Sequence, residues 1–495
     1  MFSLYIVVFL IAVGALGHRY RGRRQHLPPS PRGHWLFAHT FEVPSYKPWR
    51  KFDEWGRTNG SLYSLSIAGT PIIVLNEFKA ANDLLNKRLN LFSTRQPRVM
   101  ASLCGFDKAL TLLPPGPHFK KTRRYLQEAL NARATQAYES MQEAEARTFA
   151  LRLLESSSVH DESRMLYSSM LLSLSLGHRP QTLTDLVVTL SDRVAKSASL
   201  ILTPGKFWVE FFPLSKYLPS VLLGARVNRS IRTFSRDLQQ LVSESSRIMK
   251  LTLDNPEAPF SFCSKILRNA TSEDYAETKT LVDFASISMY SGAVDTTIAA
   301  LDTFFIAMML YPHIQLRAQE EVDRILGRLP THQDRPSLPF VEAVLTEILR
   351  WNPPTPMTSR RLHCDVTYGD FIFPRGCNVV ANIWGMNHDK EEFANPDEFR
   401  PERFLEPTGD ELIRKVHQAT FGFGTRVCPG QHFATSSLWI TIATLLATFT
   451  IRPVPGDEPV LDCEEGALIR VLPYSCDLKP RSTTAVDALK RSRIL

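Results

Sequence analysis

The sequence predicts a mainly α-helical protein with a minor β portion, built as one large domain behind an N-terminal membrane anchor helix. Three observations support this fold class. Apolar residues recur with helical spacing over most of the chain between residues 117 and 351. Alternating apolar residues, which are typical of strands, are confined to short segments. A nearly uninterrupted apolar stretch stands at the N-terminus.

This apolar stretch covers residues 2–17, and Arg19, Arg21, Arg23 and Arg24 follow it directly. As a helix it would be about 25 Å long, slightly short of a bilayer core of about 30 Å. A cleaved signal peptide would carry its positive charge before the apolar stretch, whereas here the charge follows it. Because basic residues stay on the cytoplasmic side, we expect a single-pass anchor and a cytosolic body.

The anchor is therefore assigned to residues 1–17. Residues 18–33 are basic and rich in proline, which predicts a stiff hinge between membrane and body. Residues 34–495 show no internal repeat and no long low-complexity segment, so we expect them to form one continuous domain.

Within this body, helical and strand patterns alternate in an uneven order. Residues 63–75 predict a strand, a turn and a second strand. Short strands are expected again near residues 365–381 and 467–478, and the residues after Pro480 are expected to fray. Helices are predicted over residues 117–130, 136–155, 184–200, 225–250, 279–310, 313–327 and 338–351.

Charge and cysteine content restrict the partners and the compartment. The net charge is +8, from 58 basic and 50 acidic residues, which favours anionic partners such as membrane surfaces and acidic proteins. The isoelectric point of about 9.1 comes without a recognition motif or basic stripe, so no nucleic-acid partner is expected. Seven cysteines, with no C-x-x-C pair, argue against a disulfide framework or structural zinc and favour reducing surroundings.

One cysteine lies in a glycine-rich loop that leads into an apolar helical run. Cys428 is followed by Pro429, which suits the first position of a helix. Backbone N–H groups and the helix dipole at such a position favour a thiolate. The neighbouring glycines let the backbone approach a flat, bulky partner. A buried structural cysteine is the plainer alternative, and a metal pair with His432 would be a poor site of two ligands.

The loop residues Phe421, Gly424, Arg426, Cys428 and Gly430 fit F-x-x-G-x-R-x-C-x-G, the heme-binding signature of the cytochrome P-450 family. The chain resembles this family over residues 27–480, and its anchor and proline-rich hinge resemble those of microsomal members, which implies the endoplasmic reticulum membrane. It also resembles fungal members that act in natural-product pathways. The resemblance implies the cytochrome P-450 fold. It also implies heme b (iron protoporphyrin IX) as cofactor, with Cys428 as the axial thiolate ligand.

Further motifs carry the same resemblance. Glu347 and Arg350 lie three residues apart on one face of a predicted helix, and Pro401-Glu402-Arg403-Phe404 follows. The spacing E-x-x-R alone means little, because it recurs elsewhere in the chain. The resemblance implies that Glu347, Arg350 and Arg403 form a buried polar lock behind the heme, whose members must all be paired.

Propionate-binding arginines are also implied. Arg123 matches the arginine of the family's W-x-x-x-R helix, although Phe119 replaces the tryptophan and cannot donate the indole N–H bond. His118 is a candidate to supply that bond. Arg360 and Arg361 both stand where the family has a propionate-binding arginine, and the sequence leaves the choice between them open.

The longest apolar helical run contains an acidic residue followed by two threonines. Asp295 in such a helix is costly unless it is hydrogen-bonded, and a threonine hydroxyl can bond back to its own helix. With the cysteine loop, the segment from Gly292 resembles the family's oxygen-activation motif, with Ala293 in place of its second glycine. The resemblance implies that Asp295 and Thr296 manage the protons that oxygen activation needs.

The activity implied is a heme-thiolate monooxygenase that inserts one atom of dioxygen into a lipophilic small molecule. NADPH-cytochrome P-450 reductase would supply electrons, with cytochrome b5 as a second candidate donor, because no convincing nucleotide-binding segment is visible. A heme-thiolate isomerase or dehydratase and a membrane-bound heme sensor remain alternatives. The resemblance places Ala293, Thr297, Thr355, Met357, Ala467 and Leu468 in the substrate pocket.

Overall fold

A computed structural model describes the chain over residues 26–35, 37–67, 69–156, 158–203, 206–255, 257–324, 328–466 and 468–492. The predicted anchor lies outside the described residues. The chain divides into two compact units. Unit 1 comprises the described residues up to Gln96 together with Met357–Met386 and Phe423–Arg426. Unit 2 comprises Pro97–Pro356, Asn387–Gly422 and the described residues from Val427 onward.

Unit 1 contains a four-stranded sheet with the strand order β1-β2-β6-β3. Strands β1 (Leu62–Ile67) and β2 (Thr70–Leu75) form the predicted hairpin, with Leu62 opposite Leu75. Strand β6 (Asn378–Asn382) runs parallel to β2, and β3 (Met357–Arg361) pairs with β6 in antiparallel fashion.

A small apolar core fastens this sheet to helix α2 (Pro48–Asn59). Phe52 and Trp55 of α2 pack with Tyr63, Leu65 and Val74 of the hairpin. The Tyr63 hydroxyl also donates a hydrogen bond of 2.8 Å to the carbonyl oxygen of Phe52, so its polar end is satisfied although the ring is buried. The other elements of the unit are α3 (Phe78–Ala81), the π-helical turn η2 (Asn82–Asn86), β4 (Val366–Tyr368), β5 (Phe371–Phe373), η7 (Gly424–Arg426) and α16 (Ile383–Asn387, whose last residue falls in unit 2).

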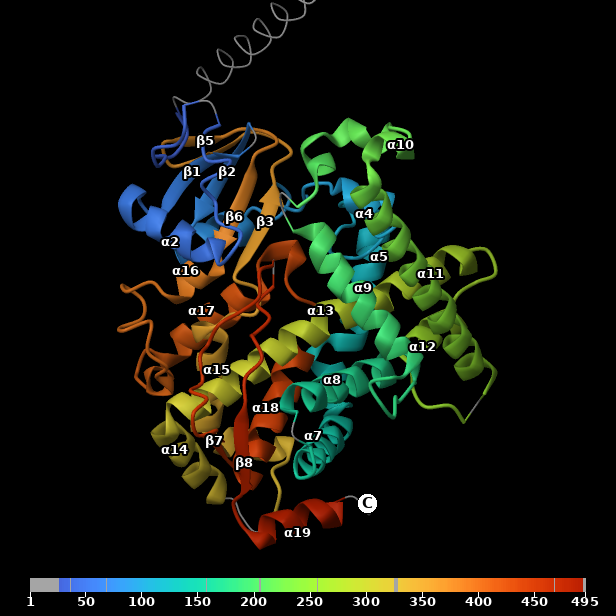
Figure 1. Cartoon of the computed structure of the whole chain (residues 1–495), viewed down its shortest axis with the longest axis vertical. Coiled ribbons are helices and arrows are strands. Elements are labelled where there is room, and N and C mark those ends of the chain that lie inside the picture. Colours follow the sequence, from blue (N-terminus) through green and yellow to red (C-terminus); the bar gives the residue numbers. More distant parts are fainter. Residues whose placement is uncertain are drawn as a thin grey trace, which may run out of the picture. The chain divides into compact units, whose positions relative to one another are not determined.

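Unit 2 is mostly helical, and α13 (Tyr275–Leu310) runs through it (Figure 1). Helix α13 packs against α8 (Val159–Leu176), α12 (Phe262–Arg268) and α18 (Gln431–Thr448). Among the described residues it is the one helix long and apolar enough to cross a membrane, but most of its apolar window is buried inside the protein. It is therefore a core helix of this unit.

Unit 2 contains further helices besides α13 and its three neighbours. Those at the start of the unit are α4 (Val99–Leu103), α5 (Pro117–Leu130), α6 (Ala132–Gln136), α7 (Glu139–Leu153) and α9 (Leu186–Leu202). Next come η3 (Trp208–Phe211), η4 (Pro213–Tyr217), α10 (Ser220–Leu223), α11 (Ala225–Asp254), α14 (Pro312–Asp323), η5 (His332–Ser337), α15 (Pro339–Trp351), η6 (Pro401–Phe404) and α17 (Gly409–Phe421).

The C-terminal end differs from the expectation. Strands β7 (Phe449–Pro453) and β8 (Cys476–Pro480) pair, and the segment expected to fray forms helix α19 (Thr483–Ser492). The physical reason is that Leu489 gives this polar segment one apolar anchor, which is fully buried. The mainly helical fold with a minor β portion is confirmed.

Candidate active site

The cysteine loop connects α17 to α18. It is closed by the Cys428 backbone N–H, which donates a hydrogen bond of 2.7 Å to the carbonyl oxygen of Phe421. Helix α18 begins at Gln431, with Gly430 as its N-cap, so the prediction that Pro429 is the first helical residue is wrong. Pro429 and Gly430 instead form a turn that holds the thiol just outside the helix N-terminus.

The surroundings of the Cys428 thiol act on its protonation in opposite directions. Burial is the largest effect and raises the pKa of the thiol overall, while a hydrogen bond from the Gly430 backbone N–H and the charge of Arg123 partly offset this rise. Arg123, on α5, donates a hydrogen bond of 2.7 Å to the carbonyl oxygen of Val427. A guanidinium is therefore fixed beside the cysteine, where it favours the thiolate.

The part of the loop in unit 1 is held by neighbouring backbone and side chains. Gly424 has φ +62°, and a Cβ atom there would collide with the carbonyl oxygen of Leu85, so this position requires glycine. The Gly424 N–H donates to the Asn86 side chain at 2.6 Å. Arg426, which is buried, donates to the Ser93 carbonyl oxygen at 3.0 Å.

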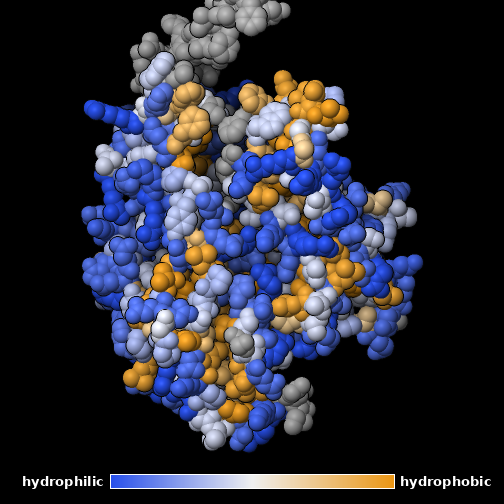
Figure 2. All heavy atoms as spheres, viewed as in Figure 1, coloured by the Kyte–Doolittle hydropathy of each residue, from blue (hydrophilic) through white to orange (hydrophobic). Residues whose placement is uncertain are grey.

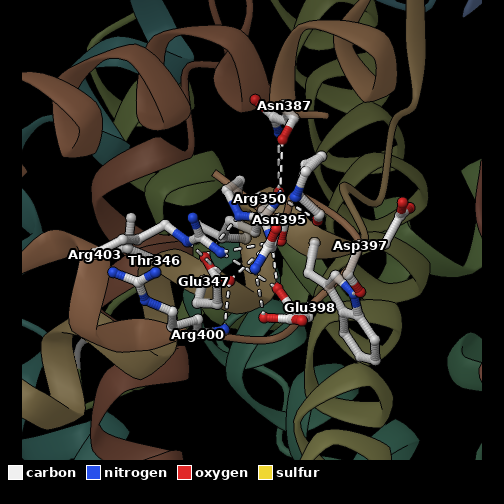
Figure 3. A network of polar contacts seen from close by, with 12 residues as sticks. Thr346, Glu347, Arg350, Asn387, Asn395, Asp397, Glu398, Arg400 and Arg403 are labelled. Atoms are coloured by element: carbon white, nitrogen blue, oxygen red, sulfur yellow. Dashed lines mark hydrogen bonds and ion pairs between the residues drawn. The ribbon is translucent and has the colours of Figure 1, made fainter. Parts of the chain in front are cut away.

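In unit 2, the structure brings Glu347, Arg350 and Arg403 together (Figure 3). Arg350 donates to both carboxylate oxygens of Glu347, at 2.7 and 2.8 Å, and Arg403 donates to Glu347 at 3.3 Å. Arg350 also donates to the carbonyl oxygens of Asn387 and Pro396, each at 2.8 Å. All three charged side chains are buried, so each depends on these partners.

By contrast, the same E-x-x-R spacing at Glu244 and Arg247 gives a surface pair. Their shortest contact is 2.6 Å, but the Arg247 side chain is 59% exposed. Position in the fold, and not the spacing itself, therefore distinguishes the buried lock from an ordinary ion pair.

The middle of α13 is accessible on one side. The helix is buried from Val294 to Met309 except at Thr296, but Gly292 is exposed and Ala293 is partly exposed. A Cβ atom added at Gly292 would meet nothing within 4 Å. Open space therefore lies beside the segment that contains the predicted oxygen-activation residues.

Asp295 of this segment is held by two arginines that the sequence did not single out. Arg470 donates to Oδ2 of Asp295 at 2.6 and 3.2 Å, and Arg164 donates to Oδ1 at 3.3 Å. Arg164 also donates to Asp192 at 3.0 Å. Burying the charge of Asp295 in an apolar helix costs free energy unless it is hydrogen-bonded, so the sequence predicts that partners exist. It does not identify them, because Arg164 and Arg470 lie 131 and 175 residues away in sequence.

A family model of cytochrome P-450 matches residues 28–478, which is most of the chain. The chain belongs to the cytochrome P-450 family. It is 34% identical over 481 residues to cytochrome P-450 monooxygenase 208 of Postia placenta, covering 94% of this chain and 93% of that relative. It is 32% identical over 498 residues to cytochrome P-450 monooxygenase claR of Ampulloclitocybe clavipes, covering 98% and 92%.

Solved structures agree on the fold. A zebrafish cytochrome P-450 in a structure with abiraterone matches with a TM-score of 0.72 at 20% identity, covering 88% of this chain and 100% of that one. The chain is thus a cytochrome P-450 monooxygenase, similar to fungal members, and its cofactor is heme b held by a cysteine thiolate.

Two observations fit heme b to this P-450. Cys428 is partly exposed as a residue although the helix that follows it is largely buried, which suits a loop residue that contacts a bound group. The exposed stretch around Gly292 leaves room for a flat group beside α13. Among the described residues, no cluster of three or more His, Cys, Asp or Glu side chains forms an alternative metal site.

His118, the candidate for the N–H bond that Phe119 cannot donate, lies at the surface of this P-450. Phe119 is buried, whereas His118 is 63% exposed and contacts Glu277 at 3.1 Å. The Nε2 atom of His118 is therefore paired with a surface carboxylate, that of Glu277. In unit 1, Arg360 is buried and donates to Thr358 Oγ1 and the Ser359 carbonyl oxygen, both at 2.9 Å, while Arg361 is partly exposed.

The threonines after Asp295 bond back to α13. Thr296 donates to the carbonyl oxygen of Gly292 at 2.9 Å, and Thr297 donates to that of Ala293 at 2.7 Å. Thr296 is partly exposed, whereas Thr297 is buried. The Thr296 hydroxyl is thus the one that can also face a ligand.

The predicted substrate-pocket residues are distributed over both units. Ala293, Thr355 and Leu468 are partly exposed in unit 2, and Met357 is partly exposed in unit 1, whereas Thr297 of unit 2 is buried. Ala467 lies outside the described residues. Partial exposure suits residues that contact a ligand, but their role in the pocket stays a prediction.

Proposed function

We propose that this P-450 inserts one oxygen atom from dioxygen into a lipophilic small molecule of fungal secondary metabolism, and that the Cys428 thiolate would hold the heme. The observation that carries the proposal is the position of Cys428, a partly exposed residue in a closed loop beside Arg123. Heme bound through a cysteine thiolate activates dioxygen and favours cleavage of its O–O bond.

The chain's own residues would hold the cofactor and move protons. Arg123 and one of Arg360 or Arg361 would pair with the propionates, since guanidinium groups bind carboxylates in a bidentate manner. Glu347, Arg350 and Arg403 would keep the loop rigid from behind. One oxygen atom enters the substrate and the other leaves as water, so each turnover consumes two electrons and two protons. Asp295 and Thr296 would supply these protons.

Electrons would come from NADPH through the membrane-bound reductase, with cytochrome b5 as a second donor. Lys120 and Arg124 of α5 are exposed, on the helix that also carries Arg123. Exposed basic residues on this helix would attract an acidic electron donor and accelerate its association.

We also place the P-450 at the endoplasmic reticulum membrane, with a cytosolic catalytic domain. The apolar N-terminal stretch with arginines behind it supports this location. A second support is an exposed apolar patch of unit 2, where Figure 2 shows hydrophobic side chains over the segment labelled α10 in Figure 1. Its members are Phe212, Leu214, Tyr217, Val221 and Leu222, which are 62 to 85% exposed.

The test is reconstitution of the full chain with the reductase in lipid vesicles, followed by screening of lipophilic compounds with isotopically labelled dioxygen. The proposal predicts NADPH-dependent products that contain one labelled oxygen atom. Products that form without NADPH would favour the isomerase or dehydratase. Heme-thiolate protein that forms no product with any compound would favour the sensor.

Location is tested separately. The full chain and a variant that lacks residues 1–17 are expressed, and the membranes are washed with alkaline carbonate. We expect the full chain to stay in the pellet and the shortened chain to be largely extracted. Equal extraction of both would contradict the anchor.

A further inference from the structure

A short hairpin near the C-terminus approaches α13 through one side chain. Residues 462–466 and 468–472, here called the C-terminal hairpin, are held by hydrogen bonds from Glu464 N–H to the Arg470 carbonyl oxygen at 2.8 Å and from Leu472 N–H to that of Asp462 at 2.9 Å. The Ile469 N–H donates to the Pro354 carbonyl oxygen at 2.9 Å, which fixes the hairpin to the segment after α15.

The Arg470 side chain leaves this hairpin and binds Asp295. Its Nη2 lies 2.6 Å and its Nε 3.2 Å from the same oxygen, Oδ2. The other oxygen, Oδ1, accepts from Arg164 of α8 at 3.3 Å. The Asp295 side chain is only 7% exposed, so the two guanidinium groups define its orientation.

Charge balance makes this arrangement depend on Arg470. Arg164 is shared between Asp295 and Asp192, and Asp192 also accepts from the Tyr290 hydroxyl at 3.0 Å. Two arginines thus face two carboxylates. Without Arg470, one arginine would serve both acids, and Oδ2 of Asp295 would lose its bonds from Arg470. Removing one partner of a low-exposure ion pair leaves the other charge poorly compensated.

We propose that Arg470 is a positioning residue for Asp295, and that the C-terminal hairpin thereby links the substrate to proton delivery. Leu468 of this hairpin is one of the predicted substrate contacts, and it is two residues from Arg470. A substrate that packs against the hairpin therefore adjusts the carboxylate through Arg470. The inference rests on the proposed function of Asp295, and it adds the element that tunes that function to the bound compound.

The experiment compares Arg470→Gln, Arg470→Lys and Arg481→Gln with the wild-type holoenzyme. Arg481 is a matched control, because it also lies near the C-terminus and makes an ion pair of 2.6 Å, but with Asp323. The first readout is amide hydrogen exchange of residues 462–472 in the resting enzyme, which requires no turnover. The second is coupling, the fraction of NADPH that yields oxygenated product, with its solvent deuterium isotope effect.

For Arg470→Gln we expect faster exchange in the hairpin, coupling reduced about tenfold and a larger solvent isotope effect, because proton transfer depends on a positioned group. Arg470→Lys keeps the positive charge but lacks the paired N–H donors of the guanidinium group. Its exchange rate, coupling and isotope effect should lie between those of wild type and Arg470→Gln. Arg481→Gln should match wild type in both readouts. In the Asp295→Asn background, Arg470→Gln should have little further effect on coupling.

Faster exchange with unchanged coupling and isotope effect would reduce Arg470 to a structural role and overturn the inference. Unchanged exchange would overturn it as well, since the hairpin would then not be held by Arg470. If Arg470→Gln does not fold, the same comparisons are made with Arg470→Lys. A wild-type enzyme that lacks the heme-thiolate spectrum or makes no oxygenated product would reveal the failure of the proposed function itself.

Discussion

Arg350 donates two hydrogen bonds to the carboxylate of Glu347, at 2.7 and 2.8 Å, and neither side chain has any exposed surface. Its remaining N–H groups point at backbone carbonyl oxygens between Asn387 and Glu398. One guanidinium therefore connects α15 to the backbone of residues 387–398, which precede α17.

Replacement of Arg350 should be severely destabilising. Arg350→Ala leaves the Glu347 carboxylate buried without its main partner, which we expect to lower the free energy of unfolding by about 3–5 kcal/mol. Denaturant unfolding followed by circular dichroism measures this loss. Arg247→Ala is the control, because it removes the same E-x-x-R pair from an exposed site and should change stability little. Equal losses in both variants would contradict the lock.

Thr296 should matter for coupling and not for the fold. Thr296→Ala removes a partly exposed hydroxyl, so we expect continued NADPH consumption with more hydrogen peroxide and less product. Peroxide and product are measured together against NADPH. Thr280→Ala is matched, since Thr280 makes the same bond back to α13, at 3.0 Å to the Ala276 carbonyl oxygen. Tight coupling in Thr296→Ala would refute the role of Thr296 in proton supply.

Stability should depend on pH through His160 and Asp302. The hydrogen bond to Asp302 raises the pKa of His160 above its ordinary value of 6.5. The imidazolium form is therefore favoured in the folded state, so its stabilising contribution is present below pH 6.5 and is lost as pH rises through the raised value. The effect is small, because the His160 side chain is 48% exposed.

The measurement is the midpoint of thermal unfolding for wild type and His160→Gln at about pH 5.5 and about pH 8.5. We expect His160→Gln to have the lower midpoint at the acidic pH and to match wild type at the alkaline pH. In an Asp302→Asn background the difference at acidic pH should disappear. A difference that is larger at alkaline pH would have the wrong sign.

Local sequence signals predicted most of the long helices, and proline marks the start of two of them. Helices α5 and α15 begin at Pro117 and Pro339, as the sequence indicates, because proline is favoured in the first turn. Helix α8 was missed. Most of its residues are buried on all sides, including several serines, so no apolar stripe with helical spacing is visible.

The candidate site was predicted in its motifs but not in its long-range contacts. Glu347 and Arg403 are 56 residues apart, and only the family resemblance suggested that they meet. Arg470 carries no local signal, since a single arginine among the apolar residues of a short predicted strand is ordinarily solvated. Its contact with Asp295 is a product of tertiary folding, which brings the C-terminal hairpin to α13.

The assignment of Cys428 as heme ligand is tested most directly by the difference spectrum of the reduced, carbon-monoxide-bound protein. Wild type and Cys364→Ser, a control that changes another partly exposed cysteine, should show the strongly red-shifted Soret band of a thiolate-ligated heme. Cys428→Ser should lose this band. A Cys428→Ser protein with an unchanged band, or a wild-type band typical of histidine ligation, would contradict the account.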